Sequence, residues 1–170
     1  MNTAKMPQLE QVQDPAPATQ TLRVMIVRCE SADQRGWLTL REALWPDCSR
    51  AEHLLDMASF IANPQRYVQF VAYADSMEAV GFCEAAVRTD YVNGTETSPV
   101  AFLEGIFVVP KARRAGIAAS LVSAVARWAA AADCRELASD AALENHAGHA
   151  FHLALGFQES ERVVFFRRVL

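Results

Sequence analysis

Residues 103–118 read LEGIFVVPKARRAGIA, and this stretch decides the fold. An apolar run, Ala101 to Val109, ends at Pro110, which is typical of a buried strand. A basic turn with a glycine follows at residues 111–116, and residues 117–132 then carry apolar side chains at helical spacing. The first amides of a helix lack intrahelical acceptors, so a strand, turn and helix in this order can bind an anion.

The turn differs from the common nucleotide-binding loops. It has neither the Gly-x-x-x-x-Gly-Lys-Ser/Thr of a P-loop nor the Gly-x-Gly-x-x-Gly of a dinucleotide site. Arg113 and Arg114 would add positive charge for phosphates. These residues alone leave two interpretations open, a diphosphate site or simply a well-capped helix.

Working outward, we expect one α/β domain with a mixed sheet and helices on both faces. Residues 1–21 have the composition of a disordered leader, and residues 22–170 form the domain. An Asn-Gly turn at 93–94 lies in a polar loop. The patterns predict strands at 22–27, 68–74, 79–87, 101–109, 135–139 and 163–169, and helices at 37–44, 54–62, 117–132 and 145–155.

Composition and charge indicate which kinds of molecule the protein could bind. The chain has 170 residues and a net charge of −4, which argues against nucleic acid and is compatible with a cationic ligand, although solubility alone explains a mildly acidic surface. Four scattered cysteines lack metal-site spacing and are expected to be free thiols in a reducing compartment, the cytoplasm. We expect no metal and, without a long apolar run, no membrane span.

The pattern Arg113-x-x-Gly116-x-Ala118 resembles the Gln/Arg-x-x-Gly-x-Gly/Ala motif of the GNAT acetyltransferases. The resemblance implies the GNAT fold and acetyl-coenzyme A as cosubstrate, with the turn amides on the pyrophosphate and the preceding strand along the pantetheine. The implied cofactor-binding residues are Ile106, Phe107, Val108, Arg114, Ala115, Gly116, Ile117, Ala118, Ala119 and Asn145.

His152 departs from the family pattern. Many GNAT enzymes carry a tyrosine in the last helix, four residues before Gly-Phe, as the general acid for the leaving thiolate, and His152 occupies that position. An imidazole could do this task. The alternative is a histidine that only packs in its helix.

Longer blocks resemble one subgroup, the aminoglycoside 6'-N-acetyltransferases. They include Leu44-Trp45-Pro46, Asp90 to Gly94, Phe102 to Gly105 and Leu155 to Glu159. The resemblance covers the chain from about Val24 onward. It implies acetylation of the 6'-amino group, antibiotic resistance and a homodimer, with direct transfer and no acetyl-enzyme. The implied substrate-site residues are Trp45, Tyr91, Glu104, Asp140 and Glu161.

An acceptor with several ammonium groups is expected to bind to carboxylates and to the faces of aromatic rings. Glu104 is the most informative acid, because a carboxylate within an apolar strand is costly to bury without a partner. Asp140 or Glu104 would take the proton of the attacking amine. Taken one at a time, each of these residues also has a purely structural interpretation. Trp45 could belong to the core and Tyr91 could pack in its turn, and the three acids could be solvated charges.

Two alternatives stay open. One is a GNAT enzyme for another amine, such as a polyamine, lysine or protein N-terminus. The other is a GNAT-like domain that binds coenzyme A or a small ligand without turnover.

Overall fold

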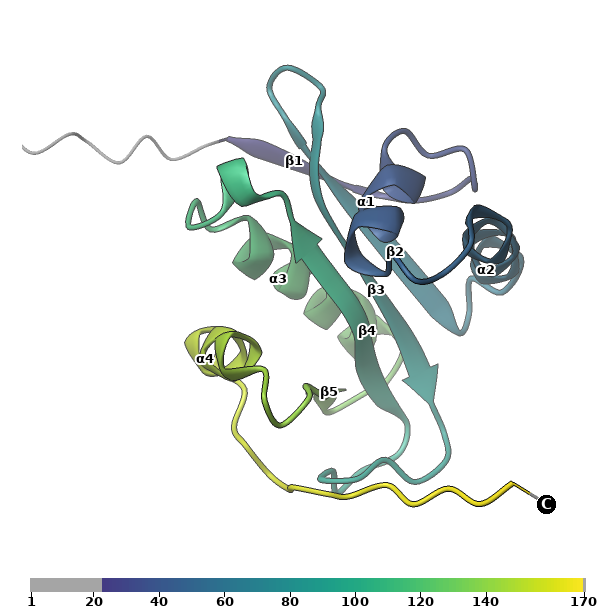
Figure 1. Ribbon diagram of the computed structural model, residues 1–170, viewed down its shortest axis with the longest axis vertical. Helices are drawn as coiled ribbons and strands as arrows, with labels where there is room; N and C mark the ends of the chain where they lie inside the picture. Colours follow the sequence, from purple (N-terminus) through teal and green to yellow (C-terminus); the bar gives the residue numbers. More distant parts are fainter. Residues whose placement is uncertain (1–22, 170) are drawn as a thin grey trace, which may run out of the picture.

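The computed structural model describes residues 23–169 and contains one mixed sheet (Figure 1). The predicted leader and Leu22 lie outside the described residues. The sheet has the order β1-β2-β3-β4-β5, with the first four strands antiparallel and β5 parallel to β4. The strands are β1 (Val24–Arg28), β2 (Tyr67–Ala74), β3 (Ala79–Arg88), β4 (Val100–Val108) and β5 (Leu137–Ser139).

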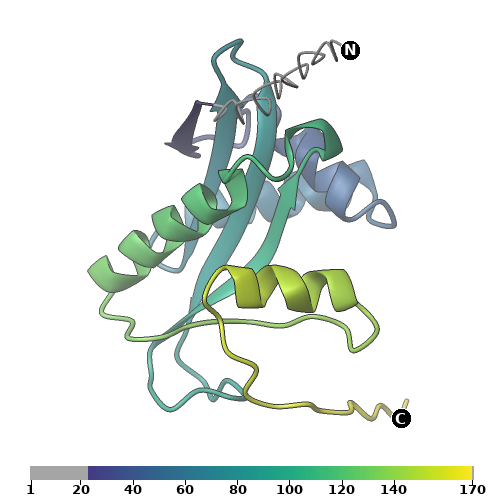
Figure 2. The same cartoon turned by 90° about the vertical axis from the view of Figure 1, so that its left-hand side faces the viewer.

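Helices cover both faces of the sheet, as predicted. α1 (Trp37–Leu44) and α2 (Arg50–Ala62) lie on one side, whereas α3 (Ile117–Ala131) and α4 (His146–Ala154) lie on the other (Figures 1 and 2). A short 3-10 turn, η1 (Pro110–Ala112), links β4 to α3. α2 begins earlier than predicted, because Ser49 and Glu52 form a reciprocal capping box at its N-terminus.

The two faces have separate cores. Under α3, Leu121 and Val125 pack with strand residues such as Cys83 and Leu103. Under α1 and α2, Trp37 and Met57 pack with strand residues that include Phe82. Their burial removes apolar surface from water on both sides, which fixes the sheet between the layers.

β4 parts from β5 in mid-strand. The parallel ladder runs from Ala101↔Leu137 to Leu103↔Ser139 and ends there. The register with β3 slips between Glu84 and Ala85, so that Glu104 is the extra residue of a bulge. From Gly105 to Val108, β4 is therefore paired with β3 alone among the described strands.

The predicted strand at 163–169 is wrong for this structure. The segment runs extended away from the sheet (Figures 1 and 2) and contains no strand. Phe165 is 86% exposed and Phe166 94% exposed. β-branched and aromatic residues favour a strand only where another strand pairs with them, and this segment has no neighbour of that kind in residues 23–169.

Candidate active site

The turn before α3 leaves open space beside Gly116. Gly116 caps the helix with φ +78°, and Arg114 is also left-handed at φ +66°. Apart from Gly116 and its neighbours in the chain, no heavy atom of residues 23–169 lies within 4 Å of the position that a Cβ on Gly116 would take. The amide of Ser120 is the first of α3 to bond back, and its acceptor is the Gly116 carbonyl. Left-handed turns at a helix N-terminus concentrate amides for an anion, so the residues fit a pyrophosphate.

Arg113 also holds the turn in place through its side chain. Its Nε donates a hydrogen bond to the Val108 carbonyl at 3.0 Å, and its guanidinium lies 5.9 Å from the centre of the Phe107 ring. Arg113 therefore ties the turn back onto β4. Its side chain is exposed, so it still adds positive charge beside the turn.

The strand residues named for pantetheine are half-buried. Ile106 and Val108 pack on the α3 side of the sheet, and Phe107 packs on the α1 side. They belong to the part of β4 that β5 leaves unpaired. An extended, amide-bearing arm can add to such an edge as another strand does.

His152 lies at the point where the two strands part. Its Nε2 is 3.0 Å from the Ser139 hydroxyl, and that hydroxyl donates to the Leu103 carbonyl at 3.2 Å. The ring is flanked by Phe151 and Phe157, each in an edge contact. His152 thus faces the last rung of the β4–β5 ladder.

Asn145 has a clear structural task. Its side-chain oxygen accepts a hydrogen bond from the Gly148 amide at 2.9 Å and so caps α4. The predicted contact with pantetheine would have to be made by the exposed remainder of this amide.

Glu104 has a charged partner and is partly exposed, so the cost of burying a lone carboxylate in an apolar strand does not arise. Its carboxylate accepts two 2.9 Å hydrogen bonds from Nη2 of Arg88, and its side chain is 35% exposed. The bulge in β4 turns Glu104 out of the apolar register, which lets solvent and Arg88 reach it. The Arg88 guanidinium also lies 3.6 Å from the centre of the Phe102 ring.

Trp45 is half-buried against β4. A Cβ on Gly105 would come within 2.5 Å of its ring, so this glycine makes room for the indole. The ring also contacts Phe82 edge-on and lies 5.0 Å from the Arg41 guanidinium.

Arg41 is itself buried and bonded to the Glu84 carboxylate at 2.6 Å. The Trp37 indole donates to the same carboxylate at 2.7 Å. Burial raises the pKa of Glu84, while the Arg41 guanidinium opposes that rise. This ion pair supports the layer on which the Trp45 ring rests.

The remaining candidates lie on exposed segments. Tyr91 is 76% exposed in the β3–β4 loop, and Asp140 and Glu161 are also exposed. The chain at Ser160 approaches this loop, because a Cβ on Gly94 would meet the Ser160 hydroxyl. No ion pair or hydrogen bond among residues 23–169 links Tyr91, Asp140 and Glu161 to one another.

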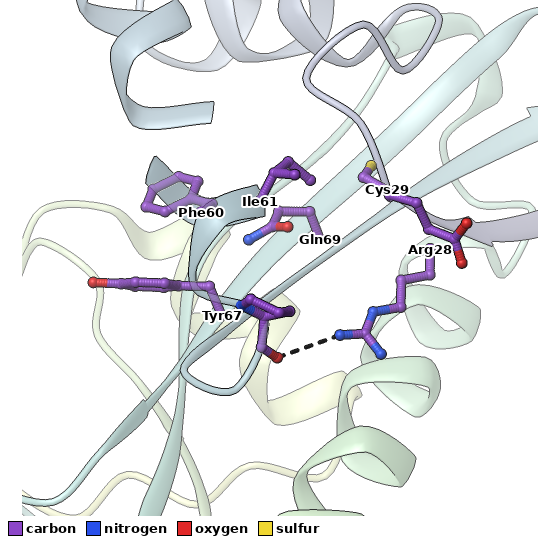
Figure 3. Close-up of a pocket in the computed structure, with 8 residues that line it drawn as sticks. Arg28, Cys29, Phe60, Ile61, Tyr67 and Gln69 are labelled. Atoms are coloured by element: carbon purple, nitrogen blue, oxygen red, sulfur yellow. Dashed lines mark hydrogen bonds between the residues drawn. The ribbon is translucent and has the colours of Figure 1, made fainter. Parts of the chain in front are cut away.

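A cavity of about 280 Å³ lies elsewhere, at the outer edge formed by β1, β2 and the end of α2 (Figure 3). Figure 3 shows Phe60, Tyr67 and Gln69 around it, with Arg28 donating to a backbone carbonyl beside it. None of the predicted site residues lines this cavity.

Cysteine chemistry has no support at the site. All four cysteines are free thiols, as predicted. Burial raises the pKa of Cys29 and of Cys83, so both stay protonated and unreactive. In the described part of the chain, no group of His, Cys, Asp and Glu could hold a metal ion, and no helix is long and apolar enough to cross a membrane.

Comparison with known proteins gives the family. The sequence matches the acetyltransferase (GNAT) family over residues 37–157. The chain belongs to this family. The fold and the cosubstrate expected from the Arg113-x-x-Gly116-x-Ala118 motif are thereby confirmed.

Individual relatives and solved structures show which GNAT enzymes this chain is similar to. The aminoglycoside N(6')-acetyltransferase type 1 of Acinetobacter baumannii is 54% identical over 132 residues, 78% of this chain and 89% of the relative. The crystal structure of AAC(6')-Ih from Acinetobacter baumannii is similar with a TM-score of 0.82 and 49% identity, covering 87% of this chain and 99% of the other. AAC(6')-Iy, solved with the bisubstrate analog CoA-S-monomethyl-acetylneamine, has a TM-score of 0.83 and 42% identity over 87% of this chain and 99% of its own.

Sequence reasoning missed three partners. Arg88 pairs with Glu104 only because the bulge changes the register, which no local pattern reveals. Ser139 meets His152 across two elements. The Arg41–Glu84 pair had a signal, since Glu84 is a lone acid within an apolar strand run.

Proposed function

We propose that this protein transfers the acetyl group of acetyl-coenzyme A to the 6'-amino group of aminoglycosides, directly in a ternary complex. The open turn at Gly116, which continues into the unpaired edge of β4, carries the proposal for the donor. The names of the relatives support the acceptor. A cytoplasmic location and a role in antibiotic resistance follow from that activity as further proposals.

The donor side works through the backbone. The amides of residues 114–119 bind the pyrophosphate, and Gly116 keeps the approach free of side chains. The edge of β4 from Ile106 to Val108 aligns the pantetheine, with Asn145 on its far side. A strand amide in this stretch polarises the acetyl carbonyl as charge develops on its oxygen.

The acceptor side works through charge. Trp45, Tyr91, Glu104, Asp140 and Glu161 are its proposed residues, and three of the five are carboxylates that attract ammonium groups. Carboxylates also favour the protonated amine, so the attacking amine must give up a proton before it reacts. Asp140 is the better candidate for the base, directly or through a water, because the Glu104 carboxylate is already held by Arg88.

We propose a homodimer of the domain formed by residues 22–170. The support is the C-terminal segment, where Val164 is 76% exposed beside Phe165 and Phe166. Exposed apolar side chains of this size mark an interaction surface. Replacing both phenylalanines by aspartate should then give a monomer in analytical ultracentrifugation, and an unchanged sedimentation coefficient would contradict the proposal.

A thiol-release assay tests the function. Acetyl-coenzyme A, kanamycin or tobramycin, and a thiol reagent are mixed with the protein, and we expect release that requires the aminoglycoside. Release with polyamines or peptides alone would point to another amine. Binding of coenzyme A without release with any of these amines would point to a domain without turnover.

A further inference from the structure

Gln69 on β2 carries a buried amide group with an unsatisfied hydrogen-bond donor. The residue is 3% exposed, and its Nε2 has no hydrogen-bond partner within residues 23–169. Buried donors in native proteins nearly always have a partner, because an unpaired donor costs free energy. The described part of the chain thus leaves one buried donor available to another molecule.

The amide of Gln69 lies in the wall of the cavity between β1, β2 and the end of α2 (Figure 3). Figure 3 shows the amide directed toward the side chains of Phe60 and Tyr67. The cavity volume of about 280 Å³ is just below the range of about 300–1,000 Å³ that is typical of ligand pockets. It is also several times the roughly 30 Å³ of one water molecule. The unpaired donor therefore faces a space that can hold a small organic molecule.

Much of the cavity surface is apolar. The rings of Phe60 and Tyr67 contact each other, with their centres 4.8 Å apart, and together form one aromatic side of the cavity. Ile61 and Pro64 add aliphatic surface. Phe60, Ile61 and Tyr67 are half-buried, so each still has apolar area to cover. A flat ring that packs against this surface would remove that area from water.

The deep part of the cavity is uncharged. Cys29 lies beside Gln69, because its amide donates to the Gln69 carbonyl at 2.9 Å, and burial raises the pKa of the Cys29 thiol, which keeps its proton. Arg28 and Glu30 also line the cavity, but both are exposed and their charges are opposite. An ionised ligand group would therefore lose its hydration beside Gln69 without meeting an opposite charge there.

We propose that this cavity binds a small, uncharged ring molecule that carries an amide group, and that the Gln69 amide recognises it. A side-chain amide has both donors and an acceptor, so it can form two hydrogen bonds with an amide of the ligand. This pairing is possible whichever way round the Gln69 amide lies. The ring of the ligand packs against Phe60 and Tyr67. None of the proposed acetyl-transfer residues lines the cavity, so this ligand is a third molecule beside the donor and the acceptor.

Benzamide and benzoate provide the first test, because they have the same ring and differ in having an amide or a carboxylate group. We titrate each into the full-length protein labelled with nitrogen-15 and follow the side-chain amide signals of Gln69 by NMR. Benzamide should shift these signals with a Kd of about 1 mM or below, and benzoate should bind at least about tenfold more weakly. Gln69 signals that benzamide does not shift, or benzoate binding as tight as that of benzamide, would overturn the proposal.

Two variants provide the second test. Gln69→Leu removes the amide, whereas Ile61→Trp fills the cavity and leaves Gln69 in place, so the proposal stays testable if one of them does not fold. Each folded variant should lose at least about tenfold in benzamide affinity, measured by calorimetry. Leu55→Trp introduces the same ring at a position of α2 that is 71% exposed, and this control should bind benzamide like the wild-type protein. Wild-type affinity in a folded Gln69→Leu or Ile61→Trp protein would overturn the proposal.

Discussion

The proposed donor half and the proposed acceptor half of the site use different chemical groups. At the turn before α3, the proposed binding groups are backbone amides arranged by two left-handed residues, Arg114 and Gly116. For the acceptor, the proposed binding groups are side chains on loops and strand ends, including Tyr91 and Asp140, which are exposed. A fixed backbone conformation can bind one cosubstrate of constant structure, whereas exposed charged side chains can bind a flexible polycation.

This difference predicts that substitutions can affect donor binding and acceptor binding separately. A substitution that changes backbone conformation should damage the donor half without altering the acceptor, and a substitution that only neutralises charge should do the reverse.

The largest effect is expected from Gly116→Val. A β-branched residue at φ +78° is strained and brings its methyl groups to the face of the turn. We expect acetyl-coenzyme A affinity to fall by about 100-fold, from strain on the order of 1–3 kcal/mol plus lost amide contacts. Calorimetry on the folded variant measures this, with Ala119→Val, on an exposed position of α3, as the matched control. Wild-type affinity in a folded Gly116→Val protein would remove the pyrophosphate site from the turn.

Asp140→Asn should spare the donor and damage the acceptor. Losing a carboxylate that pairs with an ammonium costs about 2–5 kcal/mol when the pair is desolvated, so kcat/KM for kanamycin should fall tens-fold or more. Binding of acetyl-coenzyme A should not change. If Asp140 is also the base, kcat itself falls and the acidic limb of the pH–rate profile disappears. Asp133→Asn, another exposed acid, serves as control, and equal kinetics in the two variants would argue against this role of Asp140.

Glu104→Gln should have a smaller effect than Asp140→Asn. Arg88 already neutralises much of this carboxylate, and the pair is partly solvated. We expect a loss of several-fold in kcat/KM for kanamycin. Arg88→Met should then strengthen acceptor binding, because it frees the carboxylate. Tighter binding that does not depend on Glu104 in the double variant would contradict this account.

The smallest effect concerns the loop that carries Tyr91. The Thr97 hydroxyl and the amides of Thr97 and Glu96 hold the pKa of Glu136 below its usual range. A lowered folded-state pKa means that the stability from these bonds is fully present above the ordinary carboxyl pKa of 4.5 and is lost as the pH falls below it. Glu136→Gln should therefore lower Tm modestly at pH 7 and not at pH 3. A Tm difference that persists at pH 3 would show that protonation of Glu136 is not the cause.

The sequence predicted the strand, turn and helix of the proposed donor half, but it did not predict the side-chain contacts around the proposed acceptor half. The strand, turn and helix at 101–132 rest on apolar periodicity and on a glycine that must be left-handed, both of which are local. The Glu104–Arg88 pair depends on a bulge, and His152 meets Ser139 across elements far apart in the chain. Such contacts follow from register and packing, which local patterns do not contain.

The C-terminal segment illustrates the same limit. Residues 163–169 have strong strand propensity, yet a strand needs a neighbour, and the described chain supplies none there. The strand propensity of these residues indicates an extended conformation, but it does not indicate which strand they would pair with.

The most direct test of the proposed function compares two aminoglycosides that differ at one atom. Neomycin carries an amino group at the 6' position, and paromomycin carries a hydroxyl group there. We expect thiol release from acetyl-coenzyme A with neomycin, a product acetylated at the 6' nitrogen, and little or no release with paromomycin. Equal turnover of both compounds, or acetylation of neomycin at another nitrogen, would contradict the proposal that this protein is a 6'-N-acetyltransferase.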